Sequence, residues 1–248
     1  MNRYFVAGGT SGIGRQCTFE LLRRGDEVVA IGRGDEHAED LRQSVPASLR
    51  PLLTVVVGDL TDVATARQVV TAGNPGPVAG LVNSVGCISV GGIETETPER
   101  WKSTIATNLD SAFNITQALL PRLRQSSGSS IVNVSSICSR RPCESLSYSV
   151  SKAALDMFTM HLAKDLARYS IRVNSVNPGV VKTNLQLGSG LFEDKAAYER
   201  WLKEMAALHP LGGGSVEDVA SAVLFLLGRG STWITGTVLA VDGGRAVA

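Results

Sequence analysis

The sequence predicts an α/β fold, a doubly wound parallel sheet flanked by helices on both faces, from two observations. Short β-rich segments alternate with helical patterns along the 248 residues, as right-handed crossover connections require. Several β segments, such as Leu52–Val57, are continuous apolar runs, which is typical of strands covered by helices on both faces. No internal repeat or low-complexity tract interrupts the pattern, so we expect one domain over residues 1–248. Strands are predicted at Tyr4–Ala7, Glu27–Ile31, Leu52–Val57, Gly80–Asn83, Ser130–Val134, Arg172–Val176 and Val238–Val241.

Two of the intervening segments carry sequence features that are typical of helices. Val216–Leu227 follows Ser215, a favourable N-cap, with Asp218 three residues after the cap. Another segment begins at Pro98 and carries apolar residues at helical spacing, which we interpret as a core-packing stripe. The stripe consists of Trp101, Ile105, Leu109 and Phe113.

Composition excludes several classes of function. Lys and Arg number 24 against 23 Asp and Glu, so no basic excess favours a nucleic-acid partner. No apolar run approaches the ~20 residues that span a bilayer, and glycine interrupts the N-terminal apolar segment too early for a signal peptide. We therefore expect a cytoplasmic protein without a membrane segment. The four cysteines form no C-x-x-C pair and share no ligand spacing with the three histidines, so we expect free thiols and no metal site.

A glycine-rich turn directly follows the first predicted strand and opens a helix. Glycines there allow a tight turn, a close approach of backbone to phosphate, and close helix packing. The first amides of the helix can then bind a pyrophosphate. The turn predicts a dinucleotide site formed by Gly8, Thr10, Ser11, Gly12, Ile13 and Gly14.

The end of the second strand bears on which dinucleotide binds. A site for NAD usually has an acidic residue here, whereas this chain has Gly32 followed by Arg33. An arginine can pair with a 2′-phosphate, which favours NADP(H) over NAD(H). Asp35 and Glu36 could serve the opposite preference, and Arg33 could simply be a solvated surface residue.

Eight motifs in a known order give the chain a resemblance to the classical short-chain dehydrogenase/reductase family over essentially its whole length. They are Gly8-x-x-x-Gly12-x-Gly14, Asp59-Leu60, Asn83-Ser84-Val85-Gly86, Asn108, Ser135-Ser136, Tyr148-x-x-x-Lys152, Asn177–Thr183, and Ile234-Thr235-Gly236 with Val241–Gly244. The resemblance implies a Rossmann fold with a seven-stranded parallel sheet. It also implies cofactor contacts from Asp59, Leu60, Asn83, Gly86, Tyr148, Lys152, Pro178, Gly179, Val181 and Thr183.

The resemblance implies a catalytic role for four residues. Tyr148 would be the general acid in reduction and the general base in oxidation, and Ser136 would bind the substrate oxygen. Lys152 would hold the nicotinamide ribose, and Asn108 would hold a water in the proton relay. Tyr148 and Lys152 are four residues apart and share a helix face, so the ammonium should lower the phenol pKa from its usual ~10.

The chain departs from the family pattern at a few places. Ala7 replaces the usual threonine before the glycine turn, and Ser84 and Val85 replace Asn and Ala. Ser136 precedes Tyr148 by 12 residues, one fewer than is common in the family. The catalytic serine is therefore either Ser135 or Ser136, and we favour Ser136 as the second serine of the motif.

These patterns predict an NAD(P)-dependent oxidoreductase that interconverts a ketone or aldehyde and an alcohol. The alternatives are an acyl-carrier-protein ketoreductase, a sugar or polyol dehydrogenase, and a cofactor-binding regulator without turnover, which would not need the four catalytic residues. The substrate pocket would be formed by residues 87–93, residues 137–147 and a flexible flap at about 184–213. Arg140 and Arg141 could anchor an anionic substrate or be solvated. Family members are commonly homotetramers, so we expect a homotetramer or homodimer.

Overall fold

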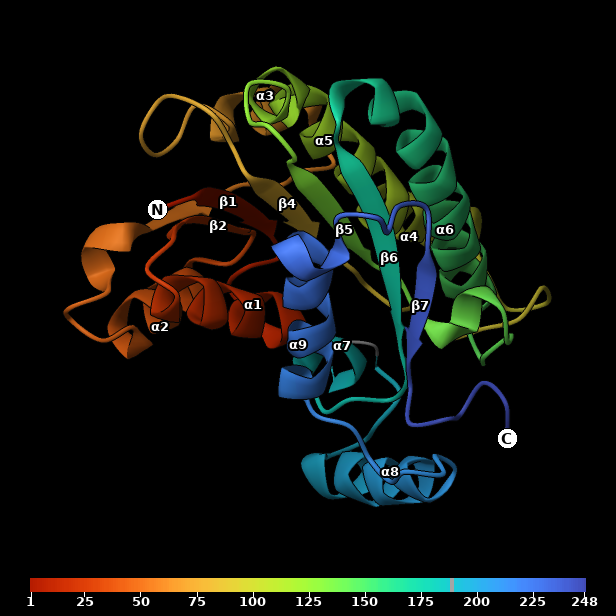
Figure 1. Cartoon of the computed structure of the whole chain (residues 1–248). Coiled ribbons are helices and arrows are strands. Elements are labelled where there is room, and N and C mark those ends of the chain that lie inside the picture. Colours follow the sequence, from red (N-terminus) through yellow and green to blue (C-terminus); the bar gives the residue numbers. More distant parts are fainter. Residues whose placement is uncertain (188–189) are drawn as a thin grey trace.

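The computed structural model describes residues 1–187 and 190–248 and confirms the predicted fold class. Its strands form one parallel sheet with the order β3-β2-β1-β4-β5-β6-β7 (Figure 1). Each strand lies within two residues of its predicted bounds. The strands are β1 (Arg3–Ala7), β2 (Glu27–Gly32), β3 (Leu53–Val57), β4 (Gly80–Asn83), β5 (Ser130–Val134), β6 (Arg172–Pro178) and β7 (Val238–Val241).

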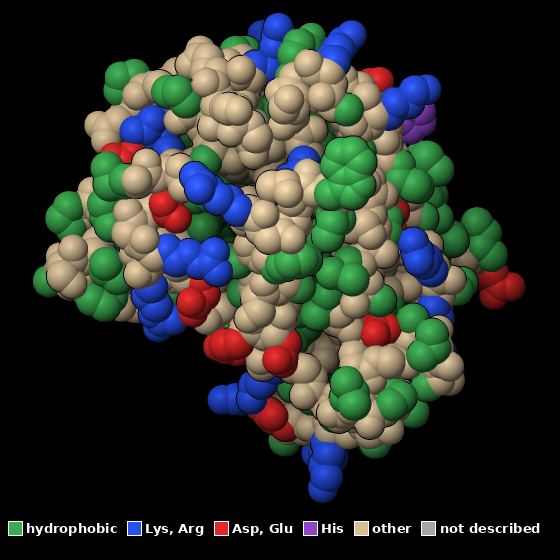
Figure 2. Space-filling view, in the orientation of Figure 1, with side chains coloured by type: hydrophobic (Ala, Val, Ile, Leu, Met, Phe, Trp, Pro, Cys, Tyr) green, Lys and Arg blue, Asp and Glu red, His purple; other side chains and the backbone are tan. Residues whose placement is uncertain are grey.

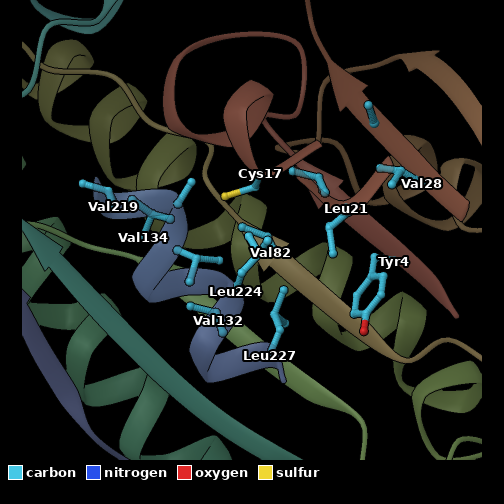
Figure 3. Close-up of a cluster of buried hydrophobic side chains, with 14 of the residues drawn as sticks. Tyr4, Cys17, Leu21, Val28, Val82, Val132, Val134, Val219, Leu224 and Leu227 are labelled. Atoms are coloured by element: carbon cyan, nitrogen blue, oxygen red, sulfur yellow. The ribbon is translucent and has the colours of Figure 1, made fainter. Parts of the chain in front are cut away.

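Helices cover both faces of the sheet (Figure 1). On one face lie α1 (Gly12–Arg23), α2 (Asp35–Ser44) and α9 (Val216–Leu227). On the other lie α3 (Val63–Val69), α4 (Pro98–Ile105), α5 (Ser111–Leu123) and α6 (Leu146–Leu166). Two apolar clusters fill the spaces between sheet and helices, and Figure 3 shows the cluster beneath α1 and α9. The strands are thus buried on both faces, which explains their continuous apolar sequences.

The capping box that the sequence predicts before α9 is confirmed. The Ser215 side chain accepts from the Asp218 amide at 3.2 Å, and the Asp218 carboxylate accepts from the Ser215 amide at 2.8 Å.

The sheet reverses its order between β1 and β4, and this switch point holds the glycine turn. The chain moves outward from β1 to β3 and then returns to the other side of β1 as β4. The loops after β1 and β4 therefore diverge at the carboxyl end of the sheet, where doubly wound folds bind ligands. Gly8 has φ +78°, and a Cβ there would lie 2.6 Å from the Ser84 carbonyl oxygen. Only glycine allows the two loops to approach so closely.

The interpretation of the apolar stripe after Pro98 as core is wrong for two of its residues. Trp101 and Phe113 are 36% and 46% exposed. The helix is interrupted between α4 and α5 by a π-helical turn, η2 (Ala106–Asp110), which alters the register of its faces. The buried positions of this segment are offset from the stripe. They include the apolar Ala112 and Ile115 and the polar Thr104, Thr107, Asn108 and Ser111.

The segment after β6 lies beyond the carboxyl end of the sheet, apart from the two helix layers (Figure 1). It contains α7 (Asn184–Leu187) and α8 (Lys195–Ala207). The predicted flap of 184–213 includes residues 188 and 189, which lie outside the described residues. Tyr198 joins α8 to the loop, since its hydroxyl donates to the Thr183 carbonyl at 2.9 Å and accepts from the Thr183 amide at 3.2 Å. No helix among the described residues combines the length and apolarity needed to span a membrane.

Candidate active site

A cavity of about 840 Å³ lies at the carboxyl end of the sheet and extends from the glycine turn to α8. The loops after the first six strands all contribute to its wall. Lys and Arg side chains are interspersed with Asp and Glu on the face that Figure 2 shows, with no continuous basic stripe there. No group of three or more His, Cys, Asp or Glu side chains within residues 1–187 and 190–248 could hold a metal ion.

The glycine turn fits a bound phosphate. Ser11 is the N-cap of α1 but makes no side-chain cap hydrogen bond, and the first turn carries no acidic residue. Ser11, Gly12 and Ile13 line the cavity, so the free amides of this turn are available to an anion. A Cβ at Gly14 would lie 2.3 Å from the Gly8 carbonyl oxygen, so a side chain there would deform the turn.

Arg33 lies at the other end of the cavity, where an adenosine would bind. Its guanidinium is 3.8 Å from the Asp59 carboxylate, and both side chains are about half exposed. Arg33 and His37 line the cavity, whereas Asp35 and Glu36 in the first turn of α2 are not among its lining residues. The two residues expected at the adenosine thus pair with each other, and the competing acids lie outside the wall.

Tyr148 and Lys152 occupy the first two turns of α6. Ser145 caps the helix by accepting from the Tyr148 amide at 3.3 Å. Both side chains are buried, with 6% and 3% exposure. The Lys152 ammonium donates to the Val134 carbonyl at 3.0 Å and lies 5.7 Å from the centre of the Tyr148 ring. The predicted pair is therefore brought together on one face of the helix.

The two candidate serines face different partners. Ser135 Oγ donates to the Lys152 carbonyl at 3.0 Å, which ties the end of β5 to α6. Ser136 lines the same cavity as Tyr148 and acts to lower the pKa of its phenol, and Ser136 Oγ accepts from the Cys138 amide at 3.1 Å. Ser136 is thus the serine whose hydroxyl lies beside the phenol.

The expected lowering of the Tyr148 pKa is wrong for the ligand-free protein. Burial raises the pKa of Tyr148, because the site removes water from the phenolate. Burial also lowers the pKa of Lys152 to about 8. The lysine ammonium hydrogen-bonds the Val134 carbonyl, and burial has the largest effect on the phenol pKa.

Asn108 joins the loop after β4 to α6. Its side-chain amide donates to the Cys87 carbonyl at 3.0 Å and to Ser151 Oγ at 2.8 Å, and its Oδ1 accepts from the Cys87 amide at 2.8 Å. A Cβ at Gly86 would lie 3.5 Å from Asn108 Oδ1 and 3.6 Å from Lys152 Nζ. The asparagine, the glycine and the lysine therefore meet, while the water-holding role of Asn108 stays a prediction.

Most of the other predicted cofactor residues line the same cavity. They are Gly8, Thr10, Asp59, Leu60, Gly86, Pro178, Gly179, Val181 and Thr183. Gly14, Asn83 and Asn108 are not in its wall and lie behind it. Asn83 is buried, and its amide donates to Asn133 Oδ1 at 2.8 Å.

Two supporting residues were not predicted. His209 Nε2 accepts from the Val180 amide at 3.2 Å and so holds the loop after β6. Asp156, one turn after Lys152, accepts from Ser175 Oγ and Asn177 Nδ2, each at 3.0 Å. The spacing of Asp156 from Lys152, one helical turn, could have indicated that the two residues are neighbours. No residue near His209 in the sequence indicates its contact with Val180.

Comparison with known proteins agrees with this geometry. A family model described as enoyl-(acyl carrier protein) reductase matches residues 7–246. L-xylulose reductase of Caenorhabditis elegans is 35% identical over 98% of this chain and 94% of its own. A 3-oxoacyl-(acyl-carrier-protein) reductase of Chlamydia muridarum is 31% identical over 97% of this chain and 96% of its own. The structure of ElxO with NADP bound superimposes with a TM-score of 0.86 at 26% identity, covering 100% of this chain and 99% of that one. The chain therefore belongs to the classical short-chain dehydrogenase/reductase family and is an oxidoreductase acting on CH–OH or carbonyl groups.

Proposed function

We propose that this protein is an NADPH-dependent carbonyl reductase or alcohol dehydrogenase in which Tyr148 transfers the proton. The observation that carries the proposal is the buried Tyr148, which shares one cavity with Ser136, Lys152 and the glycine turn. Hydride transfer is the chemistry that a bound nicotinamide supplies. The chain's own residues must then orient the substrate oxygen and move one proton.

Each catalytic residue has a distinct task in this proposal. Ser136 hydrogen-bonds the substrate oxygen and stabilises the charge that develops there. Tyr148 donates its proton to that oxygen in reduction and accepts it in oxidation. Lys152, whose pKa is about 8, carries a proton at neutral pH and favours the phenolate once its ammonium turns toward the phenol. Asn108 fixes the wall next to Lys152.

Removal of the phenol hydroxyl tests the catalytic assignment. Tyr148→Phe should abolish turnover while NADPH binding, measured by calorimetry, stays largely unchanged. Tyr169→Phe, on the turn after α6, is the control and should keep full activity. A Tyr148→Phe enzyme with normal turnover would refute the assignment.

The serine choice has its own test. Ser136→Ala should reduce kcat by roughly 100-fold, the order expected when one group that stabilises developing charge is lost. Ser135→Ala should affect folding stability more than the chemical step, because its hydroxyl bonds the Lys152 carbonyl. A larger loss of kcat in Ser135→Ala would reverse the choice.

The preference for NADP(H) rests on Arg33. Arg33 lines the adenosine end of the cavity, while Asp35 and Glu36 do not, so the Arg33 guanidinium, which lies 3.8 Å from Asp59, is the cation available to a 2′-phosphate. Arg33→Ala should raise the KM for NADPH far more than the KM for NADH. Arg42→Ala, on α2 but outside the cavity, is the matched control. Equal effects on the two cofactors would remove the argument.

The substrate is proposed to be a small ketone, aldehyde or alcohol with an apolar part. Leu185, Leu191 and Trp201 from the segment after β6 line the same cavity as Tyr148. The similar L-xylulose reductase and 3-oxoacyl reductase suggest a sugar ketone and a 3-oxoacyl thioester as first test substrates. A thioester carried by an acyl carrier protein would need a basic docking patch, for which Arg140 and Arg141 are the candidates. Arg141 donates to the Arg245 carbonyl at 3.1 Å and Arg140 lies outside this cavity, so the arginine pair gives the thioester little support. Oxidation of NADPH against both substrates separates the two alternatives.

The remaining expectations are also proposals. Exposed apolar side chains gather on α4, α5 and α6, namely Trp101, Phe113, Val150, Met157 and Met160, as a subunit interface would require. Light scattering would distinguish a monomer from the expected dimer or tetramer. The cytoplasmic location, and a single domain whose segment at 184–213 acts as a flap, stay predictions.

A further inference from the structure

Two cysteines share the loop between β5 and α6. Cys138 lies in the short 3-10 turn η3 (Ile137–Ser139), and Cys143 lies shortly before the N-cap of α6. Both thiols are free, Cys143 is exposed and Cys138 is partly buried. The two side chains line the same two cavities, and each thiol shifts the pKa of the other. Such an approach, with one thiol open to solvent, is the arrangement from which a disulfide can form.

The same loop forms part of the catalytic wall. Cys138 and Cys143 both line the large cavity, and both also line a second cavity of about 460 Å³. The Cys138 amide donates to Ser136 Oγ at 3.1 Å. A change in the geometry of η3 therefore reaches the serine beside Tyr148 directly.

We propose that Cys138 and Cys143 are a modification site at which a peroxide forms an intramolecular disulfide that reversibly inactivates the enzyme. The Cys143 thiolate attacks the O–O bond of hydrogen peroxide, which gives a sulfenic acid and, after protonation, one water. The Cys138 sulfur then attacks the Cys143 sulfur and displaces the second water as the S–S bond forms. Two thiols are oxidised and one peroxide is reduced to two waters, so atoms and electrons balance.

Local hydrogen bonds support Cys143 as the attacking residue. Hydrogen bonds from Cys138 and then from Ser149 lower the pKa of Cys143, and Cys143 Sγ lies 3.4 Å from Ser149 Oγ. The thiolate is the reactive form of cysteine. The shared hydrogen bond and burial raise the pKa of Cys138, which suits it to react second. Cys17 is fully buried on the inner face of α1, so it is a suitable control.

The sequence allows a direct assay of the bond. Trypsin cuts after Arg140, between the two cysteines, while Pro142 protects the next arginine. Peptides 125–140 and 141–152 should separate from reduced protein and stay joined by the disulfide after peroxide treatment. The joined species should lack two hydrogen atoms relative to the sum of the peptides, and dithiothreitol should release it.

The functional consequence is measured as the ratio of oxidised to reduced activity for each variant. The kcat of wild type should fall by about tenfold or more after peroxide treatment and recover with dithiothreitol. The reason is that a ~1 Å displacement of a positioned group such as Ser136 can reduce the rate by ~100-fold. Cys143→Ser and Cys138→Ser should each lose this reversible response and the joined peptide, whereas Cys17→Ala should keep both.

Two outcomes would overturn the proposal. One is peroxide-treated protein whose two peptides separate, and the other is a joined peptide with unchanged kcat. The inactivation rests on the proposed function, but the peptide assay does not. A protein that forms the bond but reduces no carbonyl substrate would therefore contradict the proposed function and leave the modification site standing.

Discussion

Replacement of Lys152 by methionine tests whether burial of the ammonium governs the energetics of the site. Burial lowers the lysine pKa from 10.5 to about 8 in the folded protein. At about 1.4 kcal/mol per pH unit, this depression corresponds to about 3 kcal/mol of destabilisation when the lysine is charged in both states. The full penalty is present below pH 8, because folded and unfolded chains are then both protonated.

The destabilisation caused by the buried Lys152 charge should disappear as the pH rises from about 8 to 10.5. Between pH 8 and 10.5 the unfolded chain binds more protons than the folded chain, so the free energy of unfolding rises with pH. Lys152→Met removes this contribution. It also leaves the Val134 carbonyl without its partner, which costs about 1 kcal/mol at every pH and does not affect the slope.

Urea denaturation of the ligand-free proteins provides the assay. The stability of wild type minus that of Lys152→Met should increase by about 3 kcal/mol from about pH 7 to about pH 10.5. Lys164→Met, an exposed position on α6, should give a flat difference. A flat difference for Lys152→Met as well would mean that the buried lysine keeps its ordinary pKa, and the reasoning would be refuted.

Further predictions concern the glycine turn and the carboxylate below Lys152. Gly14→Ala places a methyl against the Gly8 carbonyl and should cost about 1–3 kcal/mol in denaturation, with weaker NADPH binding. Gly92→Ala meets nothing within 4 Å and should change stability by less than about 0.5 kcal/mol, so equal costs would contradict the steric argument. Asp156→Asn should lower stability by about 1–3 kcal/mol, because two buried donors lose their anionic acceptor. It should also move the Lys152 transition to lower pH, since Asp156 raises the lysine pKa, and an unmoved transition would exclude that contribution.

The strands were predictable because a doubly covered sheet leaves a strong local signal. Leu53–Val57 and Ser130–Val134 are each short and rich in β-branched residues, and each forms a strand close to its predicted bounds. The glycine turn was predictable for a similar reason. Gly14 is required by its contact with the Gly8 carbonyl in the same turn, so this constraint is visible in the local sequence, whereas the close approach of Gly8 to Ser84 involves a distant loop.

The helix faces after Pro98 were not predictable from apolar spacing. The core side of this segment carries Thr104 and Asn108, both nearly fully buried, while Trp101 and Phe113 stay partly exposed. Periodicity treats every apolar residue as a core candidate and every polar residue as surface. It fails here because Asn108 is buried in order to bond the Cys87 main chain, a partner 21 residues away.

The electrostatics of the site were also beyond local reasoning. Proximity of Lys152 to Tyr148 follows from spacing and is confirmed by the structure. The sign of the Tyr148 pKa shift depends on how much water the whole cavity wall removes, and that wall comes from six separate loops. That Cys138 and Cys143 line the same two cavities likewise depends on the path of a loop, which their spacing does not determine.

The arrangement of α6 explains how a flexible lysine can act at a defined place. The helix is held at three successive levels, by the Ser145 cap, by Ser135 at the Lys152 carbonyl, and by Asp156 bonded to β6. The Lys152 backbone is therefore fixed relative to both β5 and β6. The side-chain ammonium is held by its hydrogen bond to the Val134 carbonyl, so this bond is the main interaction that a ligand must exchange. A ligand that offers the ammonium an equivalent acceptor can then draw it toward Tyr148 at small cost.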